Sequence, residues 1–409
     1  MRFILVLAVV FALSSCKNEV RDNELSLELK TGMYRAILEV QDNQELPFVF
    51  EVVDKTTIKV FNAEEVIETQ EVRYVGDSIY IQLPVFEGYI AAKFDDQLIK
   101  GDFIKESLDR VVPFTAKHNQ KERFVVKNEP ITNVSGVWEV VFSKDVKGDE
   151  YIAKGIFEQK GSKVSGTFRT TTGDYRFLEG VLDGDELKLS AFDGAHAFLF
   201  TAKITDSTMN GHFYSGNHWK EPFVAKRNAT YELPHEDTLT FIKEGYDALE
   251  FSFPDANGNM ISLSDERFKD KVVLVQIMGT WCPNCLDESK YYVSQYEGLK
   301  TKGVEVVALA FEYAKTKEKA FKSIQRLRER IGIQYPILLA QYGTSDKAKA
   351  QEKLPMLNHV LSYPTTIFID KTGKVRKIHT GFNGPATGQK YLDFQKEFEV
   401  FIDVLSNEE

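Results

Sequence analysis

Cysteine, long apolar segments and surplus positive charge are all scarce in this chain of 409 residues. With three cysteines, the protein cannot rest on a framework of several disulfides. No internal apolar run reaches the roughly 18 residues that suggest a membrane-spanning helix. Lys and Arg number 51 against 61 Asp and Glu, and the net charge of −10 disfavours a nucleic-acid partner, whose phosphates a binding protein must neutralise.

The composition is that of a folded protein with more than one domain. Hydrophobic residues make up 43% and charged residues 27%, which excludes low-complexity disorder and collagen-like repeats. A chain of this length is longer than one hydrophobic core usually grows, so we expect two or three domains.

The N-terminus has the pattern of a secretory signal, a positive start followed by an uninterrupted apolar run over 3–13. The run ends in Leu13-Ser14-Ser15-Cys16, which resembles the lipobox of bacterial lipoproteins. We therefore expect a signal peptide over 1–15, a lipid on Cys16 and a polar tether over 16–25. The protein would then be anchored to a bacterial membrane in the cell envelope, facing the periplasm or the exterior. The alternative is an ordinary cleaved signal with a chance cysteine.

The stretch after the tether repeats itself, as a duplicated unit would. Alternating segments separated by Gly-Asp and Asp-Gly turns predict antiparallel strands, and no helical period interrupts them. We expect two β-rich units, 26–128 and 129–230, each a small barrel or sandwich. The matching segments, 108 to 110 positions apart, are Gly76-Asp77-Ser78 and Gly184-Asp185-Glu186, Gly101-Asp102-Phe103 and Gly211-His212-Phe213, and Pro113-Phe114 and Pro222-Phe223.

After a polar linker over 231–248, strands begin to alternate with helices. An apolar strand Val272–Met278, a helix from 283 to about 300 and a second strand Val304–Phe311 follow one another. This order predicts an α/β domain over 249–409.

Two cysteines, Cys282 and Cys285, stand at the point where the first of these strands is followed by a helix. Unpaired N–H groups and the helix dipole at a helix N-terminus favour a thiolate, the form that attacks disulfides. Pro283 suits the first helical turn because its missing N–H is unpaired there anyway. One helical turn brings both sulfurs within reach of a single disulfide. We expect Cys282 to be the exposed attacking sulfur and Cys285 the buried resolving one.

The motifs of the C-terminal part, over about 249–385, together resemble the TlpA/ResA-like envelope thioredoxins. The resemblance implies an AhpC/TSA-like thioredoxin fold and a tethered thiol-disulfide oxidoreductase acting outside the cytoplasm, often in cytochrome c maturation. It says nothing about 26–230. The motifs are Phe253-Pro254-Asp255, Asn257-Gly258, Ile261-Ser262-Leu263, Lys271-Val272-Val273, Trp281-Cys282-Pro283-x-Cys285, Tyr363-Pro364-Thr365-Thr366 and Ile369-Asp370-x-x-Gly373.

The same resemblance implies the substrate-binding residues. Pro364 matches the family's cis-proline, packed against the dithiol, and Tyr363 before it would offer its backbone to an extended substrate peptide. Trp281 and Pro283, beside the attacking sulfur, are expected on the same face. The implied partners are disulfide-containing envelope proteins.

Glu288 matches a carboxylate that some family members place beside the buried thiol. At three residues beyond Cys285 it shares a helix face with that sulfur and could relay its proton. Gln276 stands where thioredoxins proper keep a buried aspartate, and Ile277-Met278-Gly279 replaces the usual aromatic run before Thr-Trp-Cys. The alternative for Glu288 is a solvated position on a polar helix face.

Other chemistry fits the cysteine pair less well. A zinc site would need further ligands that no second cysteine pair or histidine cluster supplies, so we expect no metal. Peroxiredoxins share the fold, but the threonine three residues before their nucleophile is replaced by Gly279 here. Nothing resembles a nucleotide or flavin site, so we expect no cofactor. A reductase would take electrons from a membrane thiol relay, and an oxidase role is the second possibility within this class.

A different class of function remains open for the β-rich half. A ligand-binding lipoprotein with a non-catalytic thioredoxin domain would need a cavity in the second β unit. Four side chains there could line one, although ordinary packing also explains them. They are His212, Tyr214, His218 and Trp219.

Overall fold

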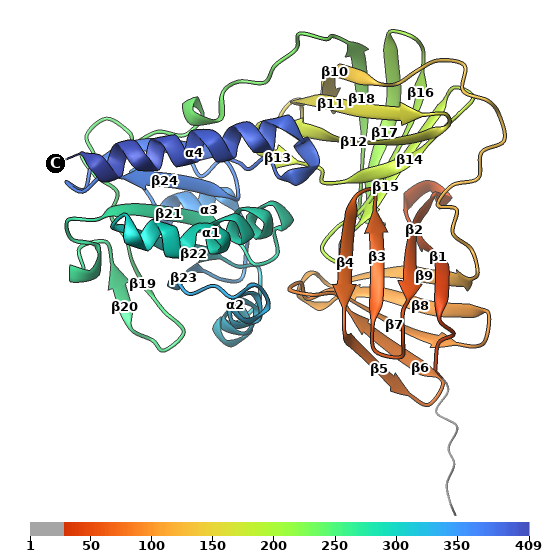
Figure 1. Cartoon of the computed structure of the whole chain (residues 1–409), viewed down its shortest axis with the longest axis horizontal. Coiled ribbons are helices and arrows are strands. Elements are labelled where there is room, and N and C mark those ends of the chain that lie inside the picture. The colour runs from red at the N-terminus through yellow and green to blue at the C-terminus, as the bar shows by residue number, and fades with distance from the viewer. Residues whose placement is uncertain (1–27, 409) are drawn as a thin grey trace, which may run out of the picture.

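The computed structural model describes residues 28–408, in which two β-rich parts precede an α/β domain (Figure 1). The first part is a nine-stranded antiparallel sheet in the order β4-β3-β2-β1-β9-β8-β7-β6-β5. Its strands alternate buried and outward side chains, and the buried aromatics Tyr34, Phe48, Phe50 and Phe114 fill the inside. The strands are β1 (Gly32–Glu39), β2 (Glu45–Val52), β3 (Ile58–Asn62), β4 (Glu65–Thr69), β5 (Glu71–Val75), β6 (Ser78–Gln82), β7 (Tyr89–Phe94), β8 (Leu98–Lys105) and β9 (Arg110–His118).

The second part is also a nine-stranded sheet, in the order β11-β10-β18-β17-β16-β15-β14-β12-β13. A further pairing of β11 with β12 closes it into a barrel, which removes the exposed edges. Trp138 is fully buried in its core and donates its indole N–H to the carbonyl of Val134 at 2.9 Å. The strands are β10 (Gly136–Phe142), β11 (Tyr151–Lys160), β12 (Lys163–Thr170), β13 (Gly173–Asp174), β14 (Leu178–Asp183), β15 (Glu186–Phe192), β16 (Ala197–Ile204), β17 (Thr208–Ser215) and β18 (Trp219–Arg227).

The two β-rich parts pack against each other through apolar and polar contacts. Phe192 of the barrel stacks on Phe48 of the first sheet with ring centroids 4.3 Å apart. The side-chain amide of Asn62 donates to the carbonyl of Phe192 at 2.9 Å. The first sheet ends at β4 and β5 whereas the second closes on itself, and their origin by duplication stays a prediction.

The C-terminal part has the thioredoxin-like architecture, with a five-stranded sheet in the order β23-β22-β21-β24-β25. The central strand β21 is buried at every position, as expected for a strand covered on both faces. Helices α1 and α4 lie side by side, and Tyr291 of α1 contacts Phe394 and Phe398 of α4 (Figure 1). The elements are β19 (Ser252–Pro254), β20 (Met260–Ser262), β21 (Val272–Met278), α1 (Pro283–Thr301), β22 (Val304–Phe311), α2 (Lys317–Ile331), β23 (Ile337–Gln341), α3 (Lys347–Lys353), β24 (Thr365–Ile369), β25 (Val375–Thr380) and α4 (Gln389–Asn407).

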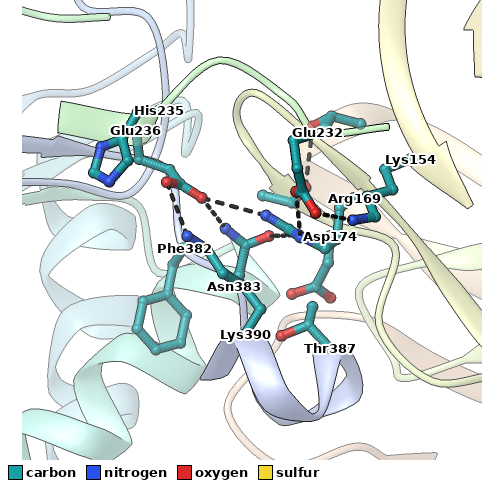
Figure 2. A network of polar contacts seen from close by, with 12 residues as sticks. Lys154, Arg169, Asp174, Glu232, His235, Glu236, Phe382, Asn383, Thr387 and Lys390 are labelled. Atoms are coloured by element: carbon teal, nitrogen blue, oxygen red, sulfur yellow. Dashed lines mark hydrogen bonds and ion pairs between the residues drawn. The ribbon is translucent and has the colours of Figure 1, made fainter. Parts of the chain in front are cut away.

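The segment 231–248, expected to be a polar linker, packs onto the α/β domain. Glu236 is buried there and accepts hydrogen bonds from Asn383 at 2.9 Å and from Lys390 at 3.1 Å (Figure 2). Arg169 of the barrel donates to the same carboxylate at 3.5 Å and to the side-chain oxygen of Asn383 at 3.0 Å. The barrel is therefore fastened to the α/β domain by a buried polar network.

Candidate active site

Cys282 and Cys285 lie at the N-terminus of α1, directly after β21 and its turn. The Cys282 sulfur caps the helix by accepting the N–H of Cys285 at 3.2 Å, and Pro283 is the first helical residue. The N–H groups at a helix N-terminus favour negative charge on a group that accepts from them. Both cysteines are free thiols, so the described site is the reduced dithiol.

The two thiols differ in their surroundings. Cys285 is fully buried, and burial together with the neighbouring Cys282 sulfur raises the pKa of the Cys285 thiol well above its ordinary value. The negative charge of Glu288 acts in the same direction. Cys285 therefore stays protonated until its proton is taken, which suits the resolving partner of a dithiol.

The segment before β24 meets the Cys282 sulfur. The Tyr363–Pro364 peptide bond is cis, and the carbonyl of Tyr363 lies 3.3 Å from the Cys282 sulfur, which donates to it as a thiol. The ring of Tyr363 also meets the ring of Trp281 edge to face at 5.5 Å. Trp281, Tyr363, Pro364 and the dithiol are thus brought together at one place.

Cys282 is not exposed, and that expectation was wrong: 7% of its surface is accessible. Its sulfur is enclosed by the Tyr363 carbonyl and the N–H of Cys285, and the adjacent half-buried Trp281 is held by a hydrogen bond from its indole N–H to the carbonyl of Phe311 at 2.9 Å. Asn284, between the cysteines, lies against the barrel, where its side-chain amide donates to the carbonyl of Asp174 at 3.2 Å. The hydroxyl of Ser362 donates to the carbonyl of Thr172 at 2.8 Å.

Glu288 is fully buried, which excludes the solvated position considered for it. Its carboxylate accepts hydrogen bonds from the amide of Gln276 at 2.8 Å, from Thr366 at 2.9 Å and from Tyr292 at 3.1 Å. Burial nevertheless raises the pKa of Glu288 above its ordinary value, because three hydrogen bonds do not fully replace water. The group can take up a proton nearer to neutrality than an exposed glutamate.

A second buried carboxyl group, Glu312, was not predicted. It follows β22 directly and accepts the N–H of Thr280 at 2.8 Å and its hydroxyl at 2.7 Å. Burial raises the pKa of Glu312 to about 7. The available signal was its position, because parallel strands β21 and β22 end at the same edge of the sheet, where the dithiol also lies.

Arg176 of the barrel was also missed. Its guanidinium donates to the carbonyl of Pro283 at 3.3 Å and forms ion pairs with Asp287 of α1 and Glu65 of β4. The side chain is 6% exposed, so these charges are paired away from water. No local pattern indicates this role, since its partners lie 111 positions away in either direction.

A cavity of about 510 Å³ lies beside the site at the junction of the three parts. His218 and Trp219, considered above for a ligand site, line it together with Trp281 and Tyr313. Its lining does not include His212 or Tyr214.

The C-terminal part of the chain is similar to known proteins. A sequence model of the AhpC/TSA family matches residues 245–378. The thiol-disulfide oxidoreductase ResA of Bacillus subtilis strain 168 is 31% identical over 159 residues, which are 39% of this chain and 79% of that relative. The chain belongs to the ResA family of thiol-disulfide oxidoreductases. The thioredoxin-like protein YneN of the same strain is 31% identical over 140 residues, 34% of this chain and 73% of the relative.

Solved structures that resemble this member of the ResA family also cover about two fifths of its chain. A putative thiol:disulfide interchange protein DsbE from Chlorobium tepidum covers 40% of this chain and 99% of its own, at 20% identity and a TM-score of 0.30. A thiol-disulfide oxidoreductase from Bacteroides fragilis covers 36% and 99%, at 22% identity and a TM-score of 0.27. The sequence relatives alone therefore carry the assignment, which makes this chain an oxidoreductase with a thioredoxin-like C-terminal domain.

Three other expectations concern a membrane-spanning helix, a metal site and the N-terminus. Within residues 28–408 no helix is both long and apolar enough to cross a bilayer. In the same range no group of three or more His, Cys, Asp or Glu side chains is arranged to hold a metal ion. The expected signal peptide, the tether and Cys16 lie outside the described residues.

Proposed function

We propose that this member of the ResA family is an extracytoplasmic enzyme that reduces or exchanges protein disulfides through Cys282 and Cys285. The observation that carries the proposal is the pairing of a helix-capping sulfur with a buried thiol one turn later. The first sulfur lies at the helix N-terminus, where backbone N–H groups favour negative charge, and the second thiol is kept protonated until it is needed.

The reaction then runs in two thiol-disulfide exchanges. The Cys282 thiolate attacks one sulfur of the substrate disulfide, forms a mixed disulfide and releases the other substrate sulfur as a thiolate. Cys285 loses its proton and attacks the Cys282 sulfur, so the second substrate sulfur leaves and the Cys282–Cys285 disulfide forms. Two electrons pass from the dithiol to the substrate, and an external dithiol must return them.

Glu288 is the proposed acceptor of the Cys285 proton. It lies on the same helix as Cys285, both are fully buried, and their charges influence each other. Its raised pKa brings proton uptake closer to the working pH, as acid–base catalysis favours.

The proposed substrate-binding face consists of Trp281, Pro283, Tyr363 and Pro364. The carbonyl of Tyr363 already lies at hydrogen-bonding distance from the attacking sulfur, so a substrate backbone paired there would bring its disulfide close to Cys282. Substrates would be disulfide-containing envelope proteins, and a membrane thiol relay would supply electrons. A lipid on Cys16 would hold the enzyme at the bacterial membrane, facing the periplasm or the exterior.

The direction of net electron flow is tested by the midpoint potential of the Cys282/Cys285 couple. We favour reduction or exchange, and expect a value near the roughly −270 mV of thioredoxin. A value near about −120 mV would instead indicate an oxidase. Reduction of insulin, with dithiothreitol as the electron source, tests the activity itself. No turnover above the uncatalysed rate, both in the full chain and in an Arg169→Ala variant that loosens the barrel, would refute the proposal.

A further inference from the structure

One short segment of the barrel, residues 170–176, lies against the rim of the dithiol site, and we refer to it as the cover segment. It reaches the turn that holds the cysteines through Asn284 and Pro283, as described above. It reaches the segment before the cis-proline through Ser362. It also reaches the loop after β25, where Asp174 accepts the N–H of Gly384 at 2.6 Å. The cover segment therefore contacts three separate stretches of the thioredoxin-like domain, two of which adjoin the dithiol.

The cover segment and the thioredoxin-like domain approach each other so closely that two glycines at the contact have no room for a side chain. A Cβ atom on Gly173 would stand 2.1 Å from the side-chain nitrogen of Asn284, and one on Gly381 would stand 2.7 Å from the backbone of Thr172. Both glycines have positive φ, 142° and 79°, which side chains disfavour as well. The chain thus keeps glycine on each side of this contact, where the two backbones approach most closely.

Arg176 fastens the cover segment by charge. It joins Asp287 of α1 and Glu65 of the first sheet, with Asp193 of the barrel 3.8 Å away, so carboxylates from all three parts of the chain meet one guanidinium. Each carboxylate is largely shielded from water. Without the arginine, Glu65 and Asp287 would lose this ion pair while remaining buried, which strongly disfavours the docked arrangement.

A second fastening lies at Arg169, one residue before the cover segment. Figure 2 shows how its guanidinium points toward Asn383 and Glu236, while Lys390 of α4 reaches the same glutamate. The described contacts of Arg169 are to these groups and to Glu232, and none is to the cysteines or to the turn between them. Arg169 therefore holds the barrel without touching the dithiol.

We propose that the cover segment determines which disulfides reach Cys282: while the barrel is docked it occupies the face where a protein substrate would bind, and Arg176 is the residue that keeps it there. A folded protein disulfide has to approach the attacking sulfur in line, and the residue that carries it, Cys282, is 7% exposed. An extended substrate backbone at Tyr363 would meet Ser362, whose hydroxyl is already bonded to Thr172. Reaction with a protein therefore requires the barrel to move away. This inference deepens the proposed function and concerns the same site.

Alkylation of Cys282 by a bulky reagent tests the cover without requiring turnover. The full chain carrying Cys16→Ser and Cys285→Ser leaves Cys282 as its one thiol, since the sequence has three cysteines. The probe is a maleimide attached to a polyethylene glycol chain, and iodoacetamide measures the intrinsic reactivity of the thiol. Arg176→Ala and Arg169→Ala should each raise the rate with the bulky probe by about tenfold or more, because each breaks a buried polar fastening.

Two further variants test whether the effect is specific to the guanidinium of Arg176. Arg176→Lys keeps the positive charge but loses the planar guanidinium that can bind several carboxylates at once. Its rate of alkylation by the bulky probe should therefore lie between those of the parent chain and Arg176→Ala. Arg376→Ala removes an exposed arginine whose partners, Asp370 and Glu408, lie within the thioredoxin-like domain, and it should leave the rate unchanged. If Arg176→Ala fails to fold, as judged by circular dichroism, the Arg169→Ala rate decides.

The proposal is overturned if the bulky probe reacts with the parent chain as fast as with both Arg176→Ala and Arg169→Ala. Its failure can be told apart from failure of the proposed function, because insulin reduction is measured separately on chains that retain the dithiol. Faster bulky alkylation without insulin reduction supports the cover and refutes the activity. Insulin reduction that is equally fast with and without Arg169 supports the activity and refutes the cover.

Discussion

The side-chain nitrogen of Asn284 lies 3.2 Å from the backbone oxygen of Asp174, and this hydrogen bond joins the middle of the C-x-x-C sequence to the barrel. The same nitrogen donates to the carbonyl of Phe382 at 3.2 Å. A residue that separates the two redox cysteines is therefore held by two other elements of the fold. The dithiol and the barrel form one structural unit, and predictions about the chemistry have to consider both.

Cys282→Ser should abolish insulin reduction by the full chain. A serine hydroxyl can cap the helix as the sulfur does, but it cannot form a mixed disulfide, so the loss is chemical and not structural. Thermal unfolding of the variant should match that of the parent chain. Retained turnover would show that another group attacks the substrate.

Cys285→Ser should stop the reaction one step later. With the resolving thiol gone, the mixed disulfide at Cys282 has no internal partner and should accumulate. Non-reducing gels of the variant isolated from cells should then carry bands that disappear on reduction. The double variant Cys282→Ser with Cys285→Ser is the control, and bands that persist in it, or a clean gel for Cys285→Ser, would contradict a protein substrate.

Glu288→Gln should alter the pH profile of the resolving step. Above the raised pKa of Glu288 the carboxylate can accept the Cys285 proton, and at high pH hydroxide replaces it. The variant should therefore be slower by about ten- to a hundredfold near neutrality and approach the parent rate in alkali. Glu297→Gln, an exposed carboxylate on the same helix, serves as the control. Parallel profiles for all three proteins would leave Glu288 without a role in proton transfer.

Glu312→Gln should stabilise the fold in mild alkali. The folded pKa of about 7 exceeds the ordinary 4.5, so the protonated form is favoured in the folded state and the wild-type chain loses stability as pH rises from 4.5 to 7. A glutamine does not ionise and can keep contacts with Thr280. Urea unfolding at pH 8 should give a variant more stable by up to roughly 3 kcal/mol, with little difference at pH 4.5. A wild-type stability that does not fall over this range would contradict the prediction.

The parts of the site that the sequence predicted are those built from neighbouring residues. A strand, a short turn and a helix beginning at a proline are adjacent along the chain, so the position of Cys282 and Cys285 at a helix N-terminus follows from local preferences. The strands Val272–Met278 and Val304–Phe311 were predicted with the bounds that the structure has, because each is a mainly apolar run that ends sharply at a charged residue or a glycine. Their parallel pairing follows from the intervening helix.

Burial in the site could not be predicted in the same way, because it depends on segments that are distant in the sequence. Asn284, between the two cysteines, contacts Asp174 in a barrel segment more than 100 positions earlier, and Cys282 beside it is buried. In the sequence Glu288 is a polar position on a helix. Only the structure shows that Gln276, Tyr292 and Thr366 donate hydrogen bonds to its buried carboxylate. Periodicity gives the direction of a side chain on its own element but not what the rest of the chain puts there.

The sequence by itself determined an oxidoreductase domain of thioredoxin type and the two sulfurs that carry its chemistry, because motif spacing and helix starts are properties of contiguous residues. Only the tertiary structure decided that the barrel closes through β11 and β12, and that Arg176 gathers Glu65 and Asp287 from either side of it in sequence. Pairing buried charges requires all partners to be desolvated together. Burial of all the partners together is a property of the whole fold, so no single stretch of the sequence predicts these ion pairs.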